Sequence, residues 1–401
     1  MRGGDAVGKL KLRRTIFLVL LAVLIGLFAW CWSRVDAQAR AVVVISSVLD
    51  APVITPAASA MSGDPRLSDV RVAGNPSLVV RPAGKGPWPA IFIVNGTVPE
   101  GKDLPAVRHL AEGFARAGYL TVVPDLPGLT EDRITPRTVD AATQAAFEIS
   151  GRSDAEDGEV AIVGVSTGAT LALLAAEDPE LDGRVSLVAG VAPFSNIKTV
   201  LSVATTAYYR RPDGKLLPYD AAPFLSYVVA RSLVAALPPG RDRRTLSAEI
   251  TSVGRENPDP LHDIRRRRTD DLGPEAKSVV RLLANRDPKR FDELYAALPG
   301  GVRRDLEELS PLAEKEKISV PVELATGPHD KYFPPSQSYR IERVAPQRTV
   351  TVTGALDHAK LEVSPEDIPA FLAFDGFVVR SLHTARDATG GRTGTLSWSM
   401  M

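Results

Sequence analysis

The stretch that decides the fold is "AIVGVSTGAT", residues 161–170. Its apolar first half is typical of a buried strand, and the alanine- and leucine-rich residues 168–178 are typical of a helix. Between them a Gly-X-Ser-X-Gly pattern runs from Gly164 to Gly168, with Ser166 at its centre. A strand that turns sharply into a helix at this pattern exposes the serine hydroxyl above the sheet. We therefore predict that Ser166 is a candidate nucleophile.

Strand-like and helix-like segments alternate on both sides of this turn. Predicted strands lie at residues 69–74, 77–84, 88–96, 120–125, 159–166, 184–194, 320–327 and 348–354. Predicted helices lie at residues 104–119, 138–149, 168–178 and 365–374. Most of these strands are continuously apolar, as parallel strands covered by helices on both faces must be. The fold class predicted is α/β, with a doubly wound, mostly parallel sheet.

The alternation stops in the middle of the chain, which defines the domain boundaries. Residues 196–311 contain helix-like segments with Tyr, Pro and Arg, and they are too many for a loop. We expect them to form a helical cap on the carboxyl edge of the sheet. The other predicted parts are a basic lead and membrane anchor (1–32), a linker with at most one helix (33–68), two parts of the core (69–195 and 312–377) and a disordered tail (378–401).

The N-terminal segment predicts a membrane anchor. A basic lead that includes Arg13 and Arg14 is followed by an uncharged apolar run over residues 15–32, about long enough to cross a bilayer as a helix. The basic side is expected to stay in the cytoplasm, so the rest of the chain is extracytoplasmic. A cleaved signal peptide is the alternative, because Ala37 to Ala39 (AQA) resembles a cleavage site, and it would release the protein.

The composition excludes several classes of function. The formal net charge is zero over 401 residues, so no overall field favours nucleic acid. One cysteine and five histidines leave no disulfide framework and no plausible zinc site. We expect no metal and no cofactor.

A nucleophilic serine needs a base, and the base needs an acid that orients it. Asp330 follows the strand predicted at 320–327, and His358 follows the strand at 348–354. The order Ser166, Asp330, His358 is the one that this architecture requires. Asp357 is the alternative acid, although a residue adjacent to the histidine is rarely oriented for this hydrogen bond.

The oxyanion of a tetrahedral intermediate needs two backbone donors. We expect one to be the N–H of Thr167, which directly follows the nucleophile. The second is expected in the loop after residues 88–96, at Thr97 or its neighbour Val98, where Gly96 lets the backbone approach closely.

From about residue 69 to residue 377 the chain resembles the α/β-hydrolase superfamily. The resemblance rests on the motifs GVSTG (164–168), VVPDLPG (122–128), GPHDKYFPP (327–335) and LDHAK (356–360). It is greatest to dienelactone-hydrolase-like and serine-aminopeptidase-like esterases with a helical cap. Asn95 precedes Gly96 where many members have His-Gly, and Ser166 replaces the cysteine of true dienelactone hydrolases, which argues against that activity.

The resemblance implies a serine hydrolase that acts on a carboxylic ester or amide through an acyl-enzyme. The expected substrate is a small or lipid-like ester that fits under the cap, with the membrane as a partner of the N-terminal helix and no nucleic acid. One alternative is transfer of the acyl group to a lipid or sugar acceptor by the same residues. Another is a catalytically silent protein that binds a ligand through the cap.

Overall fold

The computed structural model describes residues 35–49, 63–211, 213–311, 318–343, 345, 347–362 and 367–390. The membrane span predicted at residues 15–32 lies outside this part of the chain. Among the described helices, none is both long enough and apolar enough to cross a bilayer.

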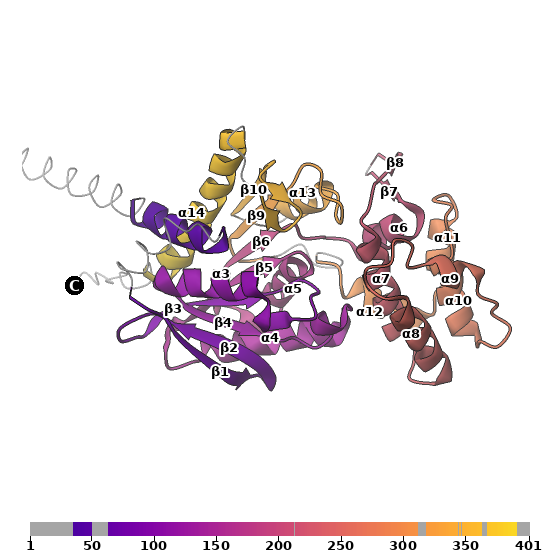
Figure 1. Ribbon diagram of the computed structural model, residues 1–401, viewed down its shortest axis with the longest axis horizontal. Coiled ribbons are helices and arrows are strands. Elements are labelled where there is room, and N and C mark those ends of the chain that lie inside the picture. The colour runs from indigo at the N-terminus through magenta and orange to yellow at the C-terminus, as the bar shows by residue number, and fades with distance from the viewer. Residues whose placement is uncertain are drawn as a thin grey trace, which may run out of the picture.

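An eight-stranded sheet forms the centre of the molecule, in the order β1-β2-β4-β3-β5-β6-β9-β10 (Figure 1). The strands are β1 (Arg66–Val72), β2 (Asn75–Arg81), β3 (Trp88–Val94), β4 (Leu120–Pro124), β5 (Ala155–Val165), β6 (Val185–Val191), β9 (Val322–Thr326) and β10 (Arg348–Val352). Strand β2 is antiparallel to both of its neighbours, and the remaining adjacent pairs are parallel. The predicted mostly parallel α/β sheet is therefore confirmed.

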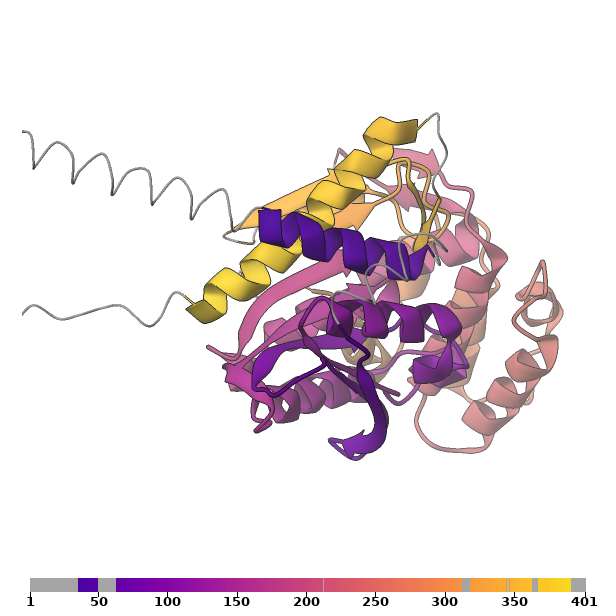
Figure 2. The same cartoon turned by 60° about the vertical axis from the view of Figure 1, so that its left-hand side comes forward.

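Helices cover both faces of the sheet, which explains why β4 and β9 are buried along their whole length. One face carries α3 (Pro105–Arg116), α14 (Ile368–Gly390) and a helix formed by residues 35–48. Figures 1 and 2 show the helix of residues 35–48 lying alongside α14. The other face carries α4 (Pro136–Ser150), α5 (Thr167–Ala176) and α13 (Ser336–Glu342).

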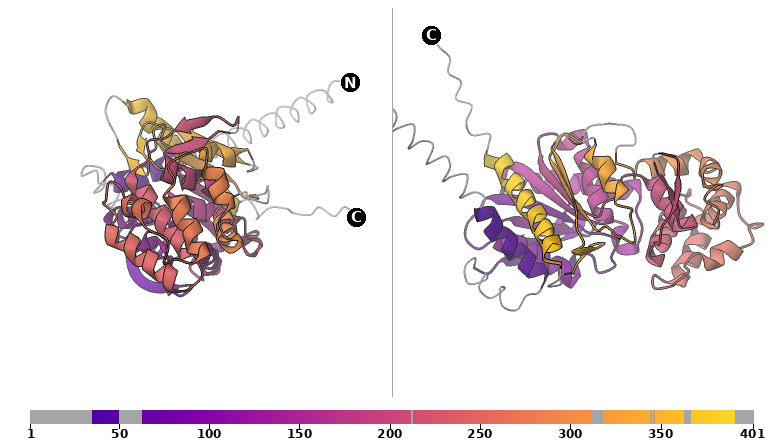
Figure 3. Two further views of the ribbon diagram at one scale, coloured as in Figure 1. Left: turned by 90° about the vertical axis from the view of Figure 1, so that its right-hand side faces the viewer. Right: turned by 90° about the horizontal axis from the view of Figure 1, so that it is seen from above.

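Residues 196–311, here called the inserted unit, lie beside one end of the sheet (Figure 3). Their helices are α6 (Ile197–Thr206), α7 (Pro223–Ala235), α8 (Arg241–Val253), α9 (His262–Arg266), α10 (Pro274–Leu283), α11 (Phe291–Ala296) and α12 (Gly300–Glu307). The Ala222 N–H donates to the Lys331 carbonyl at 2.7 Å, and the Ser232 hydroxyl accepts from the Ile134 N–H at 2.9 Å. Because Lys331 follows β9 and Ile134 follows β4, these contacts place the unit at the carboxyl edge.

The prediction of a purely helical insertion is wrong in one place. A two-stranded hairpin joins α6 to α7, formed by β7 (Tyr208–Arg210) and β8 (Leu216–Pro218). Asp213 and Gly214 lie in its turn, and Gly214 has a φ of 83°. An Asp-Gly pair between two β-prone segments is a hairpin signal that the sequence contains.

The predicted tail from residue 378 is also corrected, because α14 continues to Gly390. Residues 391–401 lie outside the described part of the chain. The apolar stripe that docks the helix on the sheet runs past the predicted boundary through Val378, Leu382 and Ala385, all buried. This spacing is helical, but His383 and its polar neighbours obscure it in the sequence.

The predicted linker, residues 33–68, contributes more to the core than expected. Its described residues include one helix, over residues 35–48, and β1 begins at Arg66 rather than at residue 69. Gln38 donates to the Asp375 carboxylate of α14 at 2.9 Å, and Asp36 pairs with Arg386 at 3.0 Å. This helix is therefore an integral part of the layer that covers the sheet.

The buried Tyr119 hydroxyl donates to the Leu382 carbonyl of α14 at 3.1 Å, so we expect Tyr119→Phe to lower the free energy of unfolding by about 1 kcal/mol.

Burial raises the pKa of Tyr119 to about 12. Unfolded Tyr119 ionises first, near pH 10, so the free energy of unfolding of wild type falls above that pH. The fall is about 1.4 kcal/mol per pH unit, so the advantage of wild type over the variant is lost within about one unit and is reversed toward pH 12. Urea denaturation measures both effects. Tyr339→Phe, at a tyrosine that is 44% exposed, is the control, and an equal loss there would contradict the assignment.

Candidate active site

Ser166 occupies a single-residue turn between β5 and α5. Strand β5 ends at Val165 and α5 begins at Thr167, so the chain reverses at Ser166 alone. Its φ of 56° and ψ of −126° are unfavourable for a residue with a side chain. The Ser166 N–H donates to the Val191 carbonyl of β6 at 2.7 Å, which holds the turn against the sheet.

The glycines of the motif are required by close backbone contacts. A Cβ atom on Gly168 would lie 2.1 Å from the carbonyl oxygen of Val94, at the end of β3. A Cβ atom on Gly164 would lie 2.4 Å from the Cα of Ala169, in the first turn of α5. Strand and helix can therefore approach as they do only because both positions lack a side chain.

The structure brings Ser166, His358 and Asp330 together in one hydrogen-bonded chain. The Oγ of Ser166 lies 2.7 Å from the Nε2 of His358, and the Nδ1 of His358 lies 2.8 Å from the Oδ2 of Asp330. An ionised carboxylate can only accept, so Nδ1 carries the proton and Nε2 accepts from the serine hydroxyl. His358 lies in the turn between the short strands β11 (Leu356–Asp357) and β12 (Lys360–Leu361) and has a φ of 54°.

The Asp330 side chain is completely buried, and its oxygens have partners beyond the histidine. Oδ1 accepts from the backbone N–H groups of Tyr332 and Phe333, at 2.7 and 2.9 Å. The Tyr219 hydroxyl, from the inserted unit, donates to the carbonyl oxygen of Asp330. Burial and the neighbouring Asp330 raise the pKa of Tyr219, so this phenol stays protonated as a donor. The alternative acid, Asp357, is exposed and is not the partner of the His358 ring.

Two aromatic residues that the sequence did not single out surround the His358 ring. Tyr332 lies against it with ring centroids 4.2 Å apart, and Phe333 meets it edge-on at 5.7 Å. Phe333 in turn contacts Phe194, beyond the end of β6, at 5.1 Å. The only signal in the sequence is that Tyr332 and Phe333 follow the candidate acid closely.

The predicted oxyanion donors, Thr97 and Thr167, line the same cavity as Ser166. Thr97, which follows β3, and Thr167, at the start of α5, both line a cavity of about 470 Å³ together with Ser166 and His358. The neighbouring Val98 lines it too. A Cβ atom on Gly96 would lie 3.3 Å from the Cβ of Ser166, which shows how closely the loop passes the serine.

The inserted unit closes this cavity on one side. Phe224, Leu225 and Val228 of its first long helix, α7, line the cavity, and so do Arg255 and Glu256. The Arg255 guanidinium lies 4.7 Å from the Phe224 ring centroid. Within the described part of the chain, no group of three or more His, Cys, Asp and Glu side chains could hold a metal ion.

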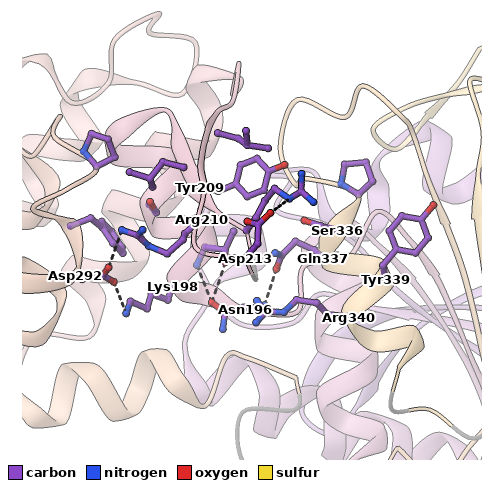
Figure 4. A pocket seen from close by; sticks show the side chains of 18 of the residues that line it. Asn196, Lys198, Tyr209, Arg210, Asp213, Asp292, Ser336, Gln337, Tyr339 and Arg340 are labelled. Atoms are coloured by element: carbon purple, nitrogen blue, oxygen red, sulfur yellow. Dashed lines mark hydrogen bonds and ion pairs between the residues drawn. The ribbon is translucent and has the colours of Figure 1, made fainter.

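A larger cavity of about 860 Å³ lies between the inserted unit and α13 (Figure 4). None of Ser166, His358 and Asp330 lines it. Asp292 binds Lys198 at 2.7 Å and Arg210 at 3.5 Å across this cavity. Asp292 is thus engaged with two of the cations of this cavity, and the hydrogen-bonded chain of Ser166, His358 and Asp330 lies outside it.

The order of the strands and the positions of the three side chains define the fold. The serine follows β5, the acid follows β9, and the histidine follows β10, all at the carboxyl edge of a sheet whose strand β2 is antiparallel. This is the arrangement around a nucleophile elbow. The chain has the α/β-hydrolase fold.

No protein-family model and no curated protein matches the chain. Among solved structures, it is similar to the rice cell wall degrading esterase LipA from Xanthomonas oryzae (16% identity, 81% of this chain and 93% of that one, TM-score 0.47). It is also similar to a Pyrobaculum calidifontis esterase (13%, 90% and 92%, 0.43) and to the meta-cleavage product hydrolase CumD from Pseudomonas fluorescens (15%, 79% and 98%, 0.41). The fold assignment rests on the strand order and the turn at Ser166.

We expect Gly168→Ala to lower the free energy of unfolding by about 3 kcal/mol, because the added methyl group meets the backbone of Val94, which cannot rotate away. Urea denaturation measures the change. Gly300→Ala is the matched control, since a Cβ atom there meets nothing within 4 Å and the position is helical. It should be neutral or slightly stabilising. Equal effects of the two substitutions would contradict the proposed crowding at the turn.

Proposed function

We propose that the protein is a serine hydrolase that acts on a carboxylic ester or amide. The observation that carries the proposal is the hydrogen-bonded chain from Ser166 through His358 to the buried carboxylate of Asp330. The serine is a weak nucleophile on its own, and this chain supplies both a base and a group that orients the base.

In the proposed mechanism His358 takes the proton of Ser166 as its Oγ attacks the substrate carbonyl carbon. The imidazolium that forms is stabilised by Asp330, which remains ionised. The N–H groups of Thr167 and Thr97 donate to the oxyanion of the tetrahedral intermediate. The intermediate collapses when His358 protonates the leaving alcohol or amine. Water, activated by the same histidine, then attacks the acyl-enzyme and releases the acid.

We expect Ser166→Ala to abolish covalent labelling by a fluorophosphonate and to lower kcat/KM for an ester by about 10⁴-fold or more. Asp330→Asn should lower kcat/KM by about 10³- to 10⁴-fold, because the amide no longer stabilises the imidazolium. Asp357→Asn is its matched control, one residue from the histidine and exposed, and should leave kcat/KM unchanged. If the folded wild-type protein is not labelled, it is a silent ligand-binding protein, and the enzymatic proposal is wrong.

We further propose that the N-terminal segment remains attached as a membrane anchor. The alternative, cleavage after Ala39, would remove Asp36, Ala37 and Gln38 from the helix that packs on the core. Ala37 is buried, Asp36 pairs with Arg386, and Gln38 binds Asp375. These contacts support an uncleaved segment, because a mature chain that began at Arg40 would lose them all.

Expression of the full chain in a bacterial host tests the anchor. We expect the protein in the membrane fraction, with an intact mass that includes residues 1–39. Arg13 and Arg14 are adjacent, as the arginines of a twin-arginine export signal are, and replacing both by glutamine controls for that export route. A soluble protein whose N-terminal residue is Arg40 would establish cleavage and contradict the proposal.

A further inference from the structure

A further cavity, here called the second cavity, adjoins the candidate site on the face of the sheet opposite to α4 and α5. Its volume is about 120 Å³, and its walls are the central strands and the helices that cover this face. Residues from the helix 35–48 (Val44, Ile45, Val48) and from α14 (Phe374, Phe377, Val378) form its outer wall. None of its described lining residues comes from the inserted unit.

This second cavity adjoins the cavity that contains Ser166. Four residues line both of them: Val48, Leu110, Val165 and Ala359. Val165 directly precedes the serine and Ala359 directly follows the histidine, so the shared wall flanks the two reacting side chains. Val48, at the junction of the two cavities, is 37% exposed.

The lining of the second cavity is almost entirely hydrocarbon. Among its described lining residues, the only polar side chain is that of Ser381, whose hydroxyl donates to the Phe377 carbonyl at 2.8 Å. A space with no unsatisfied polar group stays dry and takes apolar ligands. The opposite side of the Ser166 cavity carries Arg255 and Glu256, so the two ends of the combined space differ in polarity.

We propose that the second cavity holds the distal part of the acyl chain of an ester substrate, whose leaving group lies toward Arg255. This inference rests on the proposed function. A volume of about 120 Å³ is slightly less than the roughly 150 Å³ that accommodates benzene, so it takes about four or five carbons. Further carbons are needed to reach from Ser166 to this cavity, so the preferred acyl chain is unbranched and longer than about five carbons, and an octanoyl group meets this requirement. Specificity for the length of the acyl chain is then determined by residues of the helix 35–48 and of α14, and not by the inserted unit.

A series of p-nitrophenyl esters from acetate to dodecanoate, with the full chain in detergent, tests the inference. Each methylene group buried in the cavity should raise kcat/KM by about fourfold, up to the octanoate. Val48→Trp should fill the junction of the two cavities and lower kcat/KM for the octanoate by about tenfold or more, and it should lower the value for the acetate much less. Val42→Trp is the matched control, because Val42 lies on the same helix, is 42% exposed and lines neither cavity.

A second pair of variants changes the depth of the cavity in the opposite direction. Phe374→Ala should lengthen it and move the preferred ester from octanoate to a longer chain. Phe371→Ala on the same helix removes an equal side chain from a half-buried position outside the cavity and should leave the preference unchanged.

The outcomes separate this inference from the proposed function. Two results would overturn the acyl site and leave the hydrolase proposal intact, provided that ester hydrolysis depends on Ser166. One is hydrolysis with no preference for chain length. The other is a preference that neither Val48→Trp nor Phe374→Ala alters. Absence of both ester hydrolysis and fluorophosphonate labelling would overturn both.

Discussion

The strained, positive-φ backbone conformation of Ser166 is the constraint around which the site is built. It lets β5 pass into α5 within one residue, which lifts the serine side chain clear of the sheet. The same turn points the first free N–H groups of α5 toward the space above the serine. Gly164 and Gly168 make the turn sterically possible. The loops after β3, β9 and β10 then meet above Ser166, at the carboxyl edge of the sheet.

Burial of the Asp330 carboxylate links the inserted unit to the candidate catalytic residues. A charge that is completely removed from water is costly unless hydrogen bonds replace its hydration. Here two backbone N–H groups and the histidine ring supply them, and Tyr219 holds the carbonyl of the same residue. The inserted unit therefore does more than cover the site, because one of its tyrosines anchors the loop that orients His358.

Local sequence patterns were sufficient to predict the strands and the turn at Ser166, because these features depend on residues close together in the sequence. The apolar runs of the central strands, the turn at Ser166 and the order of the serine, acid and histidine could all be read directly from the sequence. The β7–β8 hairpin was missed because its strands are only three residues long and lie between helices. The extent of α14 and the docking of residues 35–48 depend on contacts between the two ends of the chain, which no local pattern contains. Tyr332 was missed because its position over the His358 ring depends on a contact between two loops that are distant in the sequence.

The helix of residues 35–48 has a further consequence if residues 15–32 span a membrane as proposed. At most two residues, 33 and 34, lie between that span and the described part of the helix, and the three Cα–Cα steps from residue 32 to residue 35 reach at most about 11 Å. The domain would then be tethered with no slack, with the face that carries this helix and α14 held next to the bilayer. Its orientation would be restricted to a narrow range, and esters dissolved in the bilayer would meet the enzyme at a high effective concentration, whereas esters in bulk water would have no such advantage.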